Sequence, residues 1–160
     1  MVDPATSPPP IFHLALVHPE IPQNAGNVGR MCLGVGAKLH LVHPLGFSTS
    51  ESAVRRAGLD YWKHVDVMEH TDLDAFWTWV GDRRVWCFSS HGPLAYTRAP
   101  YAVGDVLVFG RESVGLPEAL LAGRDVLHIP MTGPTRSLNL SNAAAVVAYA
   151  ALARIRPELF

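Results

Sequence analysis

Two short apolar runs, each followed by a loop of small and polar residues, constrain the fold of this chain most strongly. Residues 106–109 end at Gly110, and residues 126–129 lead through a polar loop into the apolar run 143–153. Short apolar runs bounded by Gly or Pro are typical of buried strands. Because glycine allows close approach to the main chain, we expect a side chain at Gly110 to block a ligand. Two such strand ends predict a ligand crevice at the carboxyl edge of an α/β sheet.

Strand and helix patterns alternate along the rest of the chain. Further strands are predicted at residues 12–17, 39–42, 65–68 and 85–88. Helices are predicted at residues 27–36, 50–61, 72–80, 117–122 and 141–155, the fourth with Pro at its first position. Candidate N-caps are Asn24 or Asn27, Ser50 or Ser52, Asp72 and Asn142. The alternation predicts an α/β fold, a mostly parallel sheet with helices on both faces, and the pattern alone predicts no knot.

Length and composition indicate one domain in a chain of 160 residues, nearly half of them apolar. We predict a frayed or disordered tail at residues 1–11, which are Pro-rich, and a single domain at 12–160. The apolar runs are too short to span a bilayer. The start of the chain lacks an export signal, so a cytoplasmic protein is expected. Cys32 and Cys87 are expected to be buried free thiols.

The common nucleotide and metal motifs are missing. There is no G-x-G-x-x-G, and residues 110–115 have the glycine spacing of a phosphate loop without its Lys-Ser/Thr. The eight histidines show no metal-binding spacing, so His40 and His43 are interpreted as strand-end residues and no metal is expected. The net charge of −1 means that an RNA partner requires a local basic patch.

Six motifs in chain order carry a resemblance to a known family. They are His18-Pro-Glu-Ile-Pro22, Asn24-Ala-Gly-Asn-Val-Gly-Arg30, His43-Pro-Leu-Gly-Phe47, Arg55-Arg-Ala-Gly-Leu-Asp-Tyr-Trp62, Phe109-Gly-Arg-Glu-Ser-Val-Gly-Leu-Pro117, and Ile129-Pro-Met with Ser137-Leu-Asn-Leu-Ser-Asn142. From about residue 12 to about residue 153 the chain resembles the SPOUT-class RNA methyltransferases. It is most similar to the subgroup that methylates the ribose 2′-hydroxyl of the wobble nucleotide in leucine transfer RNA.

The resemblance implies a SPOUT fold with a C-terminal trefoil knot, S-adenosylmethionine as cofactor, and the transfer RNA anticodon loop as partner. The catalytic residues that it implies are Asn24, Arg30, Glu112, Ser137 and Asn139. The cofactor-binding residues that it implies are Phe88, Gly110, Ile129, Ser137 and Leu138, largely through their main chain. Phe88, Ile129 and Leu138 fit a core position equally well.

Two roles are open for Arg30. Family accounts often make the equivalent arginine the general base, but a guanidinium pKa above about 12 makes a neutral arginine rare at pH 7. Alternatively, Arg30 holds the adjacent phosphate and stabilises charge that develops on the 2′-oxygen. Glu112 is expected to orient Arg30 or Arg136.

A basic and aromatic segment is the candidate RNA contact. Arg55, Arg56 and Lys63 flank Tyr61-Trp62, which suits phosphate contact combined with base stacking. Arg136, in the last polar loop, is a fourth candidate. The alternative is a solvated helix face with a packed Trp.

The last helix predicts a homodimer. Every residue from 143 to 153 is apolar or Tyr149, and a helix that is apolar all round must be covered all round. The sheet covers one face, so the same helix of a second subunit is expected on the other. Arg30 then acts at a site shared between subunits.

Two other function classes compete with methyl transfer. One is an RNA-binding module that kept the fold and lost catalysis, against which the intact candidate catalytic residues argue. The other is an oxidoreductase with a nicotinamide cofactor, which the missing glycine fingerprint disfavours.

Overall fold

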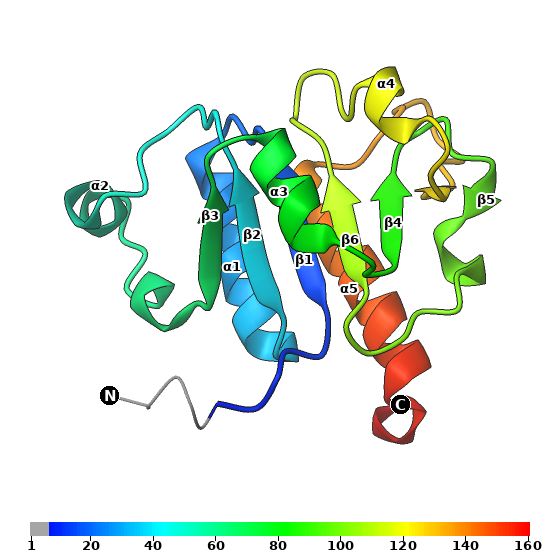
Figure 1. Cartoon of the computed structure of the whole chain (residues 1–160), viewed down its shortest axis with the longest axis horizontal. Helices are drawn as coiled ribbons and strands as arrows, with labels where there is room; N and C mark the ends of the chain where they lie inside the picture. Colours follow the sequence, from blue (N-terminus) through cyan, green and yellow to red (C-terminus); the bar gives the residue numbers. More distant parts are fainter. Residues whose placement is uncertain (1–6) are drawn as a thin grey trace.

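The computed structural model describes residues 7–160 as a parallel sheet between two helical layers (Figure 1). The strands are β1 (His13–Val17), β2 (Lys38–Val42), β3 (Val67–His70), β4 (Val85–Phe88), β5 (Leu94–Ala95), β6 (Val106–Phe109) and β7 (Val126–His128). The helices are α1 (Pro22–Val35), α2 (Glu51–Arg56), α3 (Leu73–Val80), α4 (Glu118–Leu121) and α5 (Leu140–Ile155). The short 3-10 helices are η1 (Trp62–His64), η2 (Tyr96–Arg98) and η3 (Pro157–Leu159).

The strand order β3-β2-β1-β6-β4-β7-β5 places the winding reversal between β1 and β6. All strand pairs are parallel, with His13 opposite both Lys38 and Val106 in register. The carboxyl ends of β6, β4 and β7 are therefore neighbours at one edge. This arrangement confirms the predicted α/β sheet, and such a reversal is where ligands bind in open α/β sheets.

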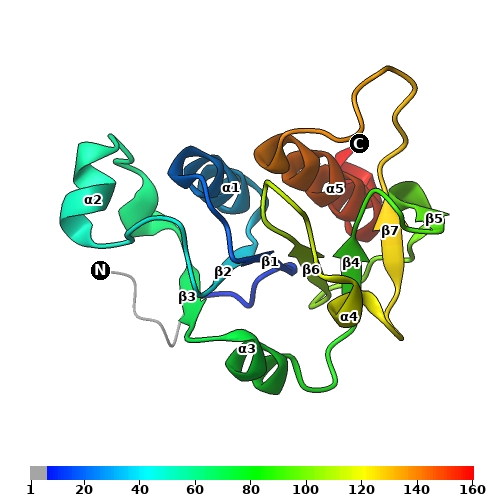
Figure 2. The ribbon, with the colours of Figure 1, turned by 90° about the horizontal axis from the view of Figure 1, so that it is seen from above.

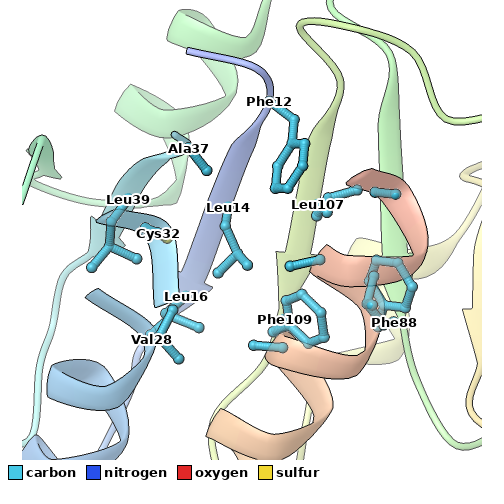
Figure 3. Close-up of a cluster of buried hydrophobic side chains, with 14 of the residues drawn as sticks. Phe12, Leu14, Leu16, Val28, Cys32, Ala37, Leu39, Phe88, Leu107 and Phe109 are labelled. Carbon is cyan, nitrogen blue, oxygen red and sulfur yellow. The ribbon is translucent and has the colours of Figure 1, made fainter. Parts of the chain in front are cut away.

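Two apolar clusters hold the layers together. Helices α1 and α5 lie side by side on one face, and α3 and α4 lie on the other (Figure 2). Alternate strand residues point to opposite faces: Leu14 and Leu16 pack with Val28 and Cys32 of α1 (Figure 3), whereas Ala15 belongs to the cluster on the α3 side. Both cysteines are buried free thiols, as expected.

Helix α1 begins five residues before the predicted start at residue 27. Pro22 occupies its first position, where a missing N–H costs no helical hydrogen bond, and Ile21 is the N-cap without a side-chain bond. The expected capping by Asn24 or Asn27 is wrong, because both lie inside the helix. The glycines that weakened the helical pattern sit where α1 meets a neighbour: a Cβ on Gly29 would lie 2.7 Å from the Trp62 ring.

Other boundaries differ as well. The helix predicted at residues 50–61 ends at Arg56, and Gly58 then adopts a positive φ of 69°. Its N-cap is Ser50, as predicted, and Asp72 caps α3. Two predictions are wrong at helix starts: Asn139 rather than Asn142 caps α5, and Pro117 is the N-cap of α4 rather than its first residue. Strand β3 lies two residues later than predicted.

At the predicted boundary of the tail, Ile11 is fixed to the domain by main-chain hydrogen bonds with Gly36 and Gly104. The predicted tail also includes residues 1–6, which lie outside the described residues. Within residues 7–160, no helix has the length and apolarity to cross a membrane. The same range holds no group of three His, Cys, Asp or Glu residues placed to bind a metal ion.

Three histidines form a hydrogen-bonded row across β1, β2 and β3. His13 Nδ1 lies 3.0 Å from His40 Nε2, and His40 Nδ1 lies 2.9 Å from His70 Nε2. The ring of Trp79 covers His40 at a centroid distance of 4.1 Å. His40 is fully buried in the middle of β2, so its interpretation as a strand-end residue is wrong. His43 follows β2 and contacts Glu69.

Burial of this row makes acid destabilisation predictable. Burial, aided by Arg83, lowers the His13 pKa from 6.5 to about 4, and burial also lowers the pKa of His40 and His70. Between the unfolded and folded pKa values, the unfolded chain binds protons that the folded chain does not. The free energy of unfolding therefore decreases as the pH is lowered. We expect the urea midpoint to be level above pH 7 and to fall steadily from pH 6.5 towards pH 4.

His40→Phe should flatten that pH dependence, although it lowers stability at pH 7 by leaving His13 and His70 without their shared partner. The exposed His91→Phe serves as the control and should keep the wild-type slope. Equal slopes for His40→Phe and wild type would assign the acid sensitivity to other groups.

Candidate active site

The Glu112 carboxylate joins two loops at the carboxyl edge of the sheet. It follows β6 and accepts hydrogen bonds from the main-chain N–H groups of Glu20 (2.8 Å) and Ile21 (3.1 Å). These groups lie at the start of α1, whose N-cap residue has no capping side chain of its own. A carboxylate at this position also interacts favourably with the helix dipole. Glu112 thus acts as the cap of α1 from about ninety residues away in sequence.

Asn24 extends this contact to the start of α5. Its Nδ2 donates to Glu112 Oε1 at 3.1 Å, and its Oδ1 accepts from Asn139 Nδ2 at 3.1 Å. Asn139 Oδ1 in turn caps α5 through the N–H of Ser141 and of Asn142. Asn24 is only 4% exposed, so both of its hydrogen bonds are needed to satisfy a buried amide. The structure therefore brings three of the predicted catalytic residues into one network, named here the Asn24–Glu112–Asn139 network.

Sequence reasoning assigned no role to Glu20 and Ser113, which fasten the same loops from the outside. Glu20 Oε1 accepts from Ser113 Oγ (2.6 Å) and from the Ser113 N–H (3.1 Å). These bonds, that from the Ser113 side chain foremost, lower the pKa of the exposed Glu20 carboxyl. Glu20 stands in the His18–Pro22 motif and Ser113 beside Glu112, so the signal for both lay in motifs already noted.

The predicted cofactor residues gather at the neighbouring strand ends. Phe88 ends β4 and Gly110 follows β6, while residues 129–138 leave β7. The Phe88 ring stacks on Phe109 at 4.6 Å inside the core, so its side chain is a packing group. Ile129 and Leu138 are half-buried, and Ser137 is exposed.

Unpaired polar groups mark the segment after β7. Within residues 7–160, the main-chain groups of residues 130–138 form no hydrogen bond with another main-chain group. Two residues before this segment, the buried Nδ1 of His128 has no hydrogen-bond partner. Most of residues 130–138 are exposed, so their main-chain groups are accessible to a polar ligand, and His128 Nδ1 is the buried group that lacks a partner here.

Gly110 has a structural role that the sequence analysis did not predict. A Cβ there would lie 2.1 Å from the carbonyl carbon of Gly115 and 2.2 Å from the nitrogen of Leu116. The loop folds back on itself, with a bridge between Arg111 and Gly115. The expectation that a side chain at Gly110 intrudes on a ligand and leaves the fold intact is corrected, because it would first meet the chain's own backbone.

Arg30 does not join the Asn24–Glu112–Asn139 network within this chain. Six residues separate it from Asn24, which places the two side chains about 120° apart around α1. Its exposed guanidinium lies 5.7 Å from the centroid of the Tyr61 ring. Neither Arg30 nor Arg136 is paired with Glu112 within residues 7–160 of one chain, so the orientation of one of these arginines by Glu112 stays a prediction.

The candidate RNA-binding segment lies beside α1. Arg55 pairs with Glu51 at 2.8 Å on the exposed side of α2, while Arg56 and Lys63 are exposed. Tyr61 donates to the Gly26 carbonyl at 3.0 Å, and Trp62 packs against Gly29. Both aromatic residues therefore anchor this segment to α1, and the alternative of a packed Trp is partly correct.

Comparison with known proteins places this geometry in context. Residues 11–149 match the model of the SpoU rRNA Methylase family. The tRNA (cytidine(34)-2'-O)-methyltransferase of Saccharophagus degradans is 43% identical, over 88% of this chain and 94% of that protein. The enzyme of the same name from Escherichia coli K12 is 39% identical, over 88% and 92%. A solved structure described as "Structural insights into the 2-OH methylation of C/U34 on tRNA" is 49% identical, with a TM-score of 0.85 over 89% of this chain and 95% of that one.

The backbone contact at Gly110 generates a prediction about folding. Gly110→Ala should lower the free energy of unfolding by about 1–3 kcal/mol, as expected for overpacking in a dense region. Gly133→Ala is the matched control, since a Cβ there meets nothing within 4 Å. Urea unfolding of both variants measures the difference, and equal midpoints would show that the loop after β6 yields without cost.

Proposed function

Because this chain belongs to the SpoU rRNA Methylase family of SPOUT methyltransferases, we propose that it methylates the ribose 2′-hydroxyl of the wobble nucleotide of a transfer RNA. The observation that carries the proposal is the Asn24–Glu112–Asn139 network. It unites polar residues from the first turn of α1, the loop after β6 and the N-cap of α5, at the sheet edge where parallel α/β folds bind ligands. Relatives at about 40% identity over most of the chain are named for this reaction.

The proposed substrate is the anticodon loop of leucine transfer RNA, with cytidine or a modified uridine at the wobble position. The motifs shared with that subgroup support it, as does the solved relative described for C/U34. Ribose methylation is compatible with either pyrimidine because the reacting oxygen belongs to the sugar. A transfer RNA substrate also supports a cytoplasmic protein.

The proposed cofactor is S-adenosylmethionine, and the residues at the sheet edge fit it. Unpaired main-chain groups of residues 130–138 suit the polar edge of adenine, and half-buried Ile129 and Leu138 offer apolar walls. Gly110 contributes main chain, and Ser137 contributes an exposed hydroxyl. When bound, the cofactor supplies a methyl group attached to a sulfonium sulfur. After the methyl transfer, the rest of the cofactor is a neutral thioether.

The chain's own residues have to position the ribose and manage the proton of the 2′-hydroxyl. Asn24, Glu112 and Asn139 use their polar atoms on one another, so their proposed role is to hold these three segments in place. Ser137 stays free to bond the ribose, since its hydroxyl has no side-chain partner within residues 7–160. Arg30 and Arg136 are proposed to hold phosphate, with Arg30 stabilising charge on the 2′-oxygen.

A homodimer is proposed to bring Arg30 to the active site. On the outer face of the α1–α5 layer, Leu33 is 39% exposed, Val146 37% and Tyr149 48%. These apolar side chains lie on two neighbouring helices and favour a symmetric partner. Since Arg30 points away from Asn24 within one chain, a second subunit is the simplest source of the missing arginine.

The trefoil knot is proposed for the region between β6 and α5. Support comes from solved relatives with the same fold and from close main-chain packing. A Cβ on Gly92 would lie 2.5 Å from the carbonyl carbon of Leu127. The loop after β4 therefore passes directly against β7, which is compatible with a threaded chain.

The reaction itself is the primary test. Purified protein with S-adenosylmethionine should place one methyl group on the wobble ribose of leucine transfer RNA, read by mass spectrometry of nuclease fragments. Calorimetry should detect S-adenosylhomocysteine and no NAD, which separates the methyltransferase from the oxidoreductase class. Label on a base, or only at another nucleotide, would contradict the proposal.

The shared site predicts complementation between two inactive variants. Arg30→Ala and Asn139→Ala homodimers should each lose at least about 90% of turnover, whereas mixed dimers should regain activity at the one site that is intact. Arg30→Lys keeps the positive charge but loses the bidentate hydrogen bonding of the guanidinium, so partial activity supports the electrostatic role. Light scattering should give twice the chain mass of 17.4 kDa. No recovery in verified mixed dimers would place Arg30 in the same subunit's site.

A further inference from the structure

An apolar cavity of about 370 Å³ lies between α1 and the segment that contains α2. Helix α1 provides Pro22, Ala25 and Gly26, while Phe47 and Trp62 contribute aromatic rings from the two ends of the facing segment. Figure 2 shows α1 between this segment and α5. The cavity is thus distinct from the strand ends proposed for the cofactor.

Hydrogen-bonding groups and cations accompany the apolar walls. Ser48 and Thr49 line the cavity; their hydroxyl groups already donate to Ser50 Oγ and Glu69 Oε1, so they can only accept hydrogen bonds from a ligand. Arg56 lines the cavity with an exposed guanidinium. Within residues 7–160, neither Arg56 nor Arg30 forms an ion pair with a carboxylate. The cavity therefore suits a flat apolar group that carries hydrogen-bonding edges and is attached to an anion.

The cavity shares the first turns of α1 with the Asn24–Glu112–Asn139 network. Pro22 and Ala25 line it, while Asn24 between them faces the network. A helix with its side chains is about 10–12 Å across, so the two sites are separated by little more than one helix. An RNA strand with unstacked nucleotides can reach from one to the other.

We propose that this cavity receives a nucleobase of the RNA substrate, from an unpaired nucleotide that neighbours the methylated one. The inference rests on the proposed function and adds a second anchoring point to it. Proteins that recognise RNA loops stack splayed bases on aromatic rings and hydrogen-bond their edges. Phe47 and Trp62 provide the aromatic surface, Ser48 and Thr49 the hydrogen bonds, and Arg56 the contact to the attached phosphate.

The test fills the cavity from the far side. Ala53→Trp adds an indole to α2 at a position that lines the cavity. The control Ser52→Trp adds the same group at the preceding position, which does not line the cavity. Binding of a fluorescent anticodon stem-loop is measured by anisotropy with S-adenosylhomocysteine present. A series of loops, each with one abasic nucleotide flanking the wobble position, identifies the base involved.

For wild type and Ser52→Trp, one abasic position should weaken binding at least fivefold. Ala53→Trp should bind the intact loop at least fivefold more weakly, and the same abasic position should then have no further effect. This loss of additivity is the signature of a base in the cavity. S-adenosylhomocysteine affinity and the urea midpoint should stay unchanged, with Ala57→Trp as a second variant if Ala53→Trp is destabilised.

The proposal is overturned if Ala53→Trp binds like Ser52→Trp, if the abasic effect persists in the filled cavity, or if wild type does not bind the loop. Methyl transfer to the same loops is followed in parallel. Base-dependent binding without methyl transfer would support a base in the cavity and reject the proposed reaction. Methyl transfer that is insensitive to Ala53→Trp would support the reaction and reject the base in the cavity.

Discussion

The Glu112 carboxylate is the contact on which the rest of the site depends. Helix α1 starts at a proline and has no capping side chain of its own, so its first N–H groups need an acceptor from elsewhere. Hydrogen bonds to a charged group contribute about 1.5–3 kcal/mol each, and Glu112 accepts three. The start of α1 is thereby fixed to the loop after β6, and through Asn24 to the cap of α5.

Close main-chain contact is the second constraint. Gly46, Gly92 and Gly110 each lie where a Cβ would come within 2.6 Å of other main-chain atoms. All three stand in loops at the carboxyl edge of the sheet, where neighbouring strands leave little space. Glycine is required here because a Cβ would meet main-chain atoms: those of the Glu20 loop at Gly46, of β7 at Gly92, and of the same loop at Gly110.

Local sequence patterns predicted the strands well and the helix starts less well. The predicted β4 and β6 match the structure residue for residue, because a strand that is buried on both faces is an uninterrupted apolar run in the sequence. Helix α1 was predicted too short because Gly26 and Gly29 interrupt its pattern, and only the packing of Leu59 and Trp62 explains them. Its cap was missed because the capping carboxylate lies far away in sequence. The candidate catalytic residues came from motifs, but the network that joins them spans more than a hundred residues and could not be read locally.

Helix α1 contacts different parts of the structure through two of its sides, and this division bears on where Arg30 can act. Asn24 faces the loop network, whereas Gly26 and Gly29 face the segment with Tyr61 and Trp62. Arg30 belongs to the side of Tyr61, away from Asn24. An arginine that acts on the ribose must therefore enter from outside the subunit or be moved by the RNA. The proposed homodimer would meet this requirement without moving α1, whose start is held by Glu112.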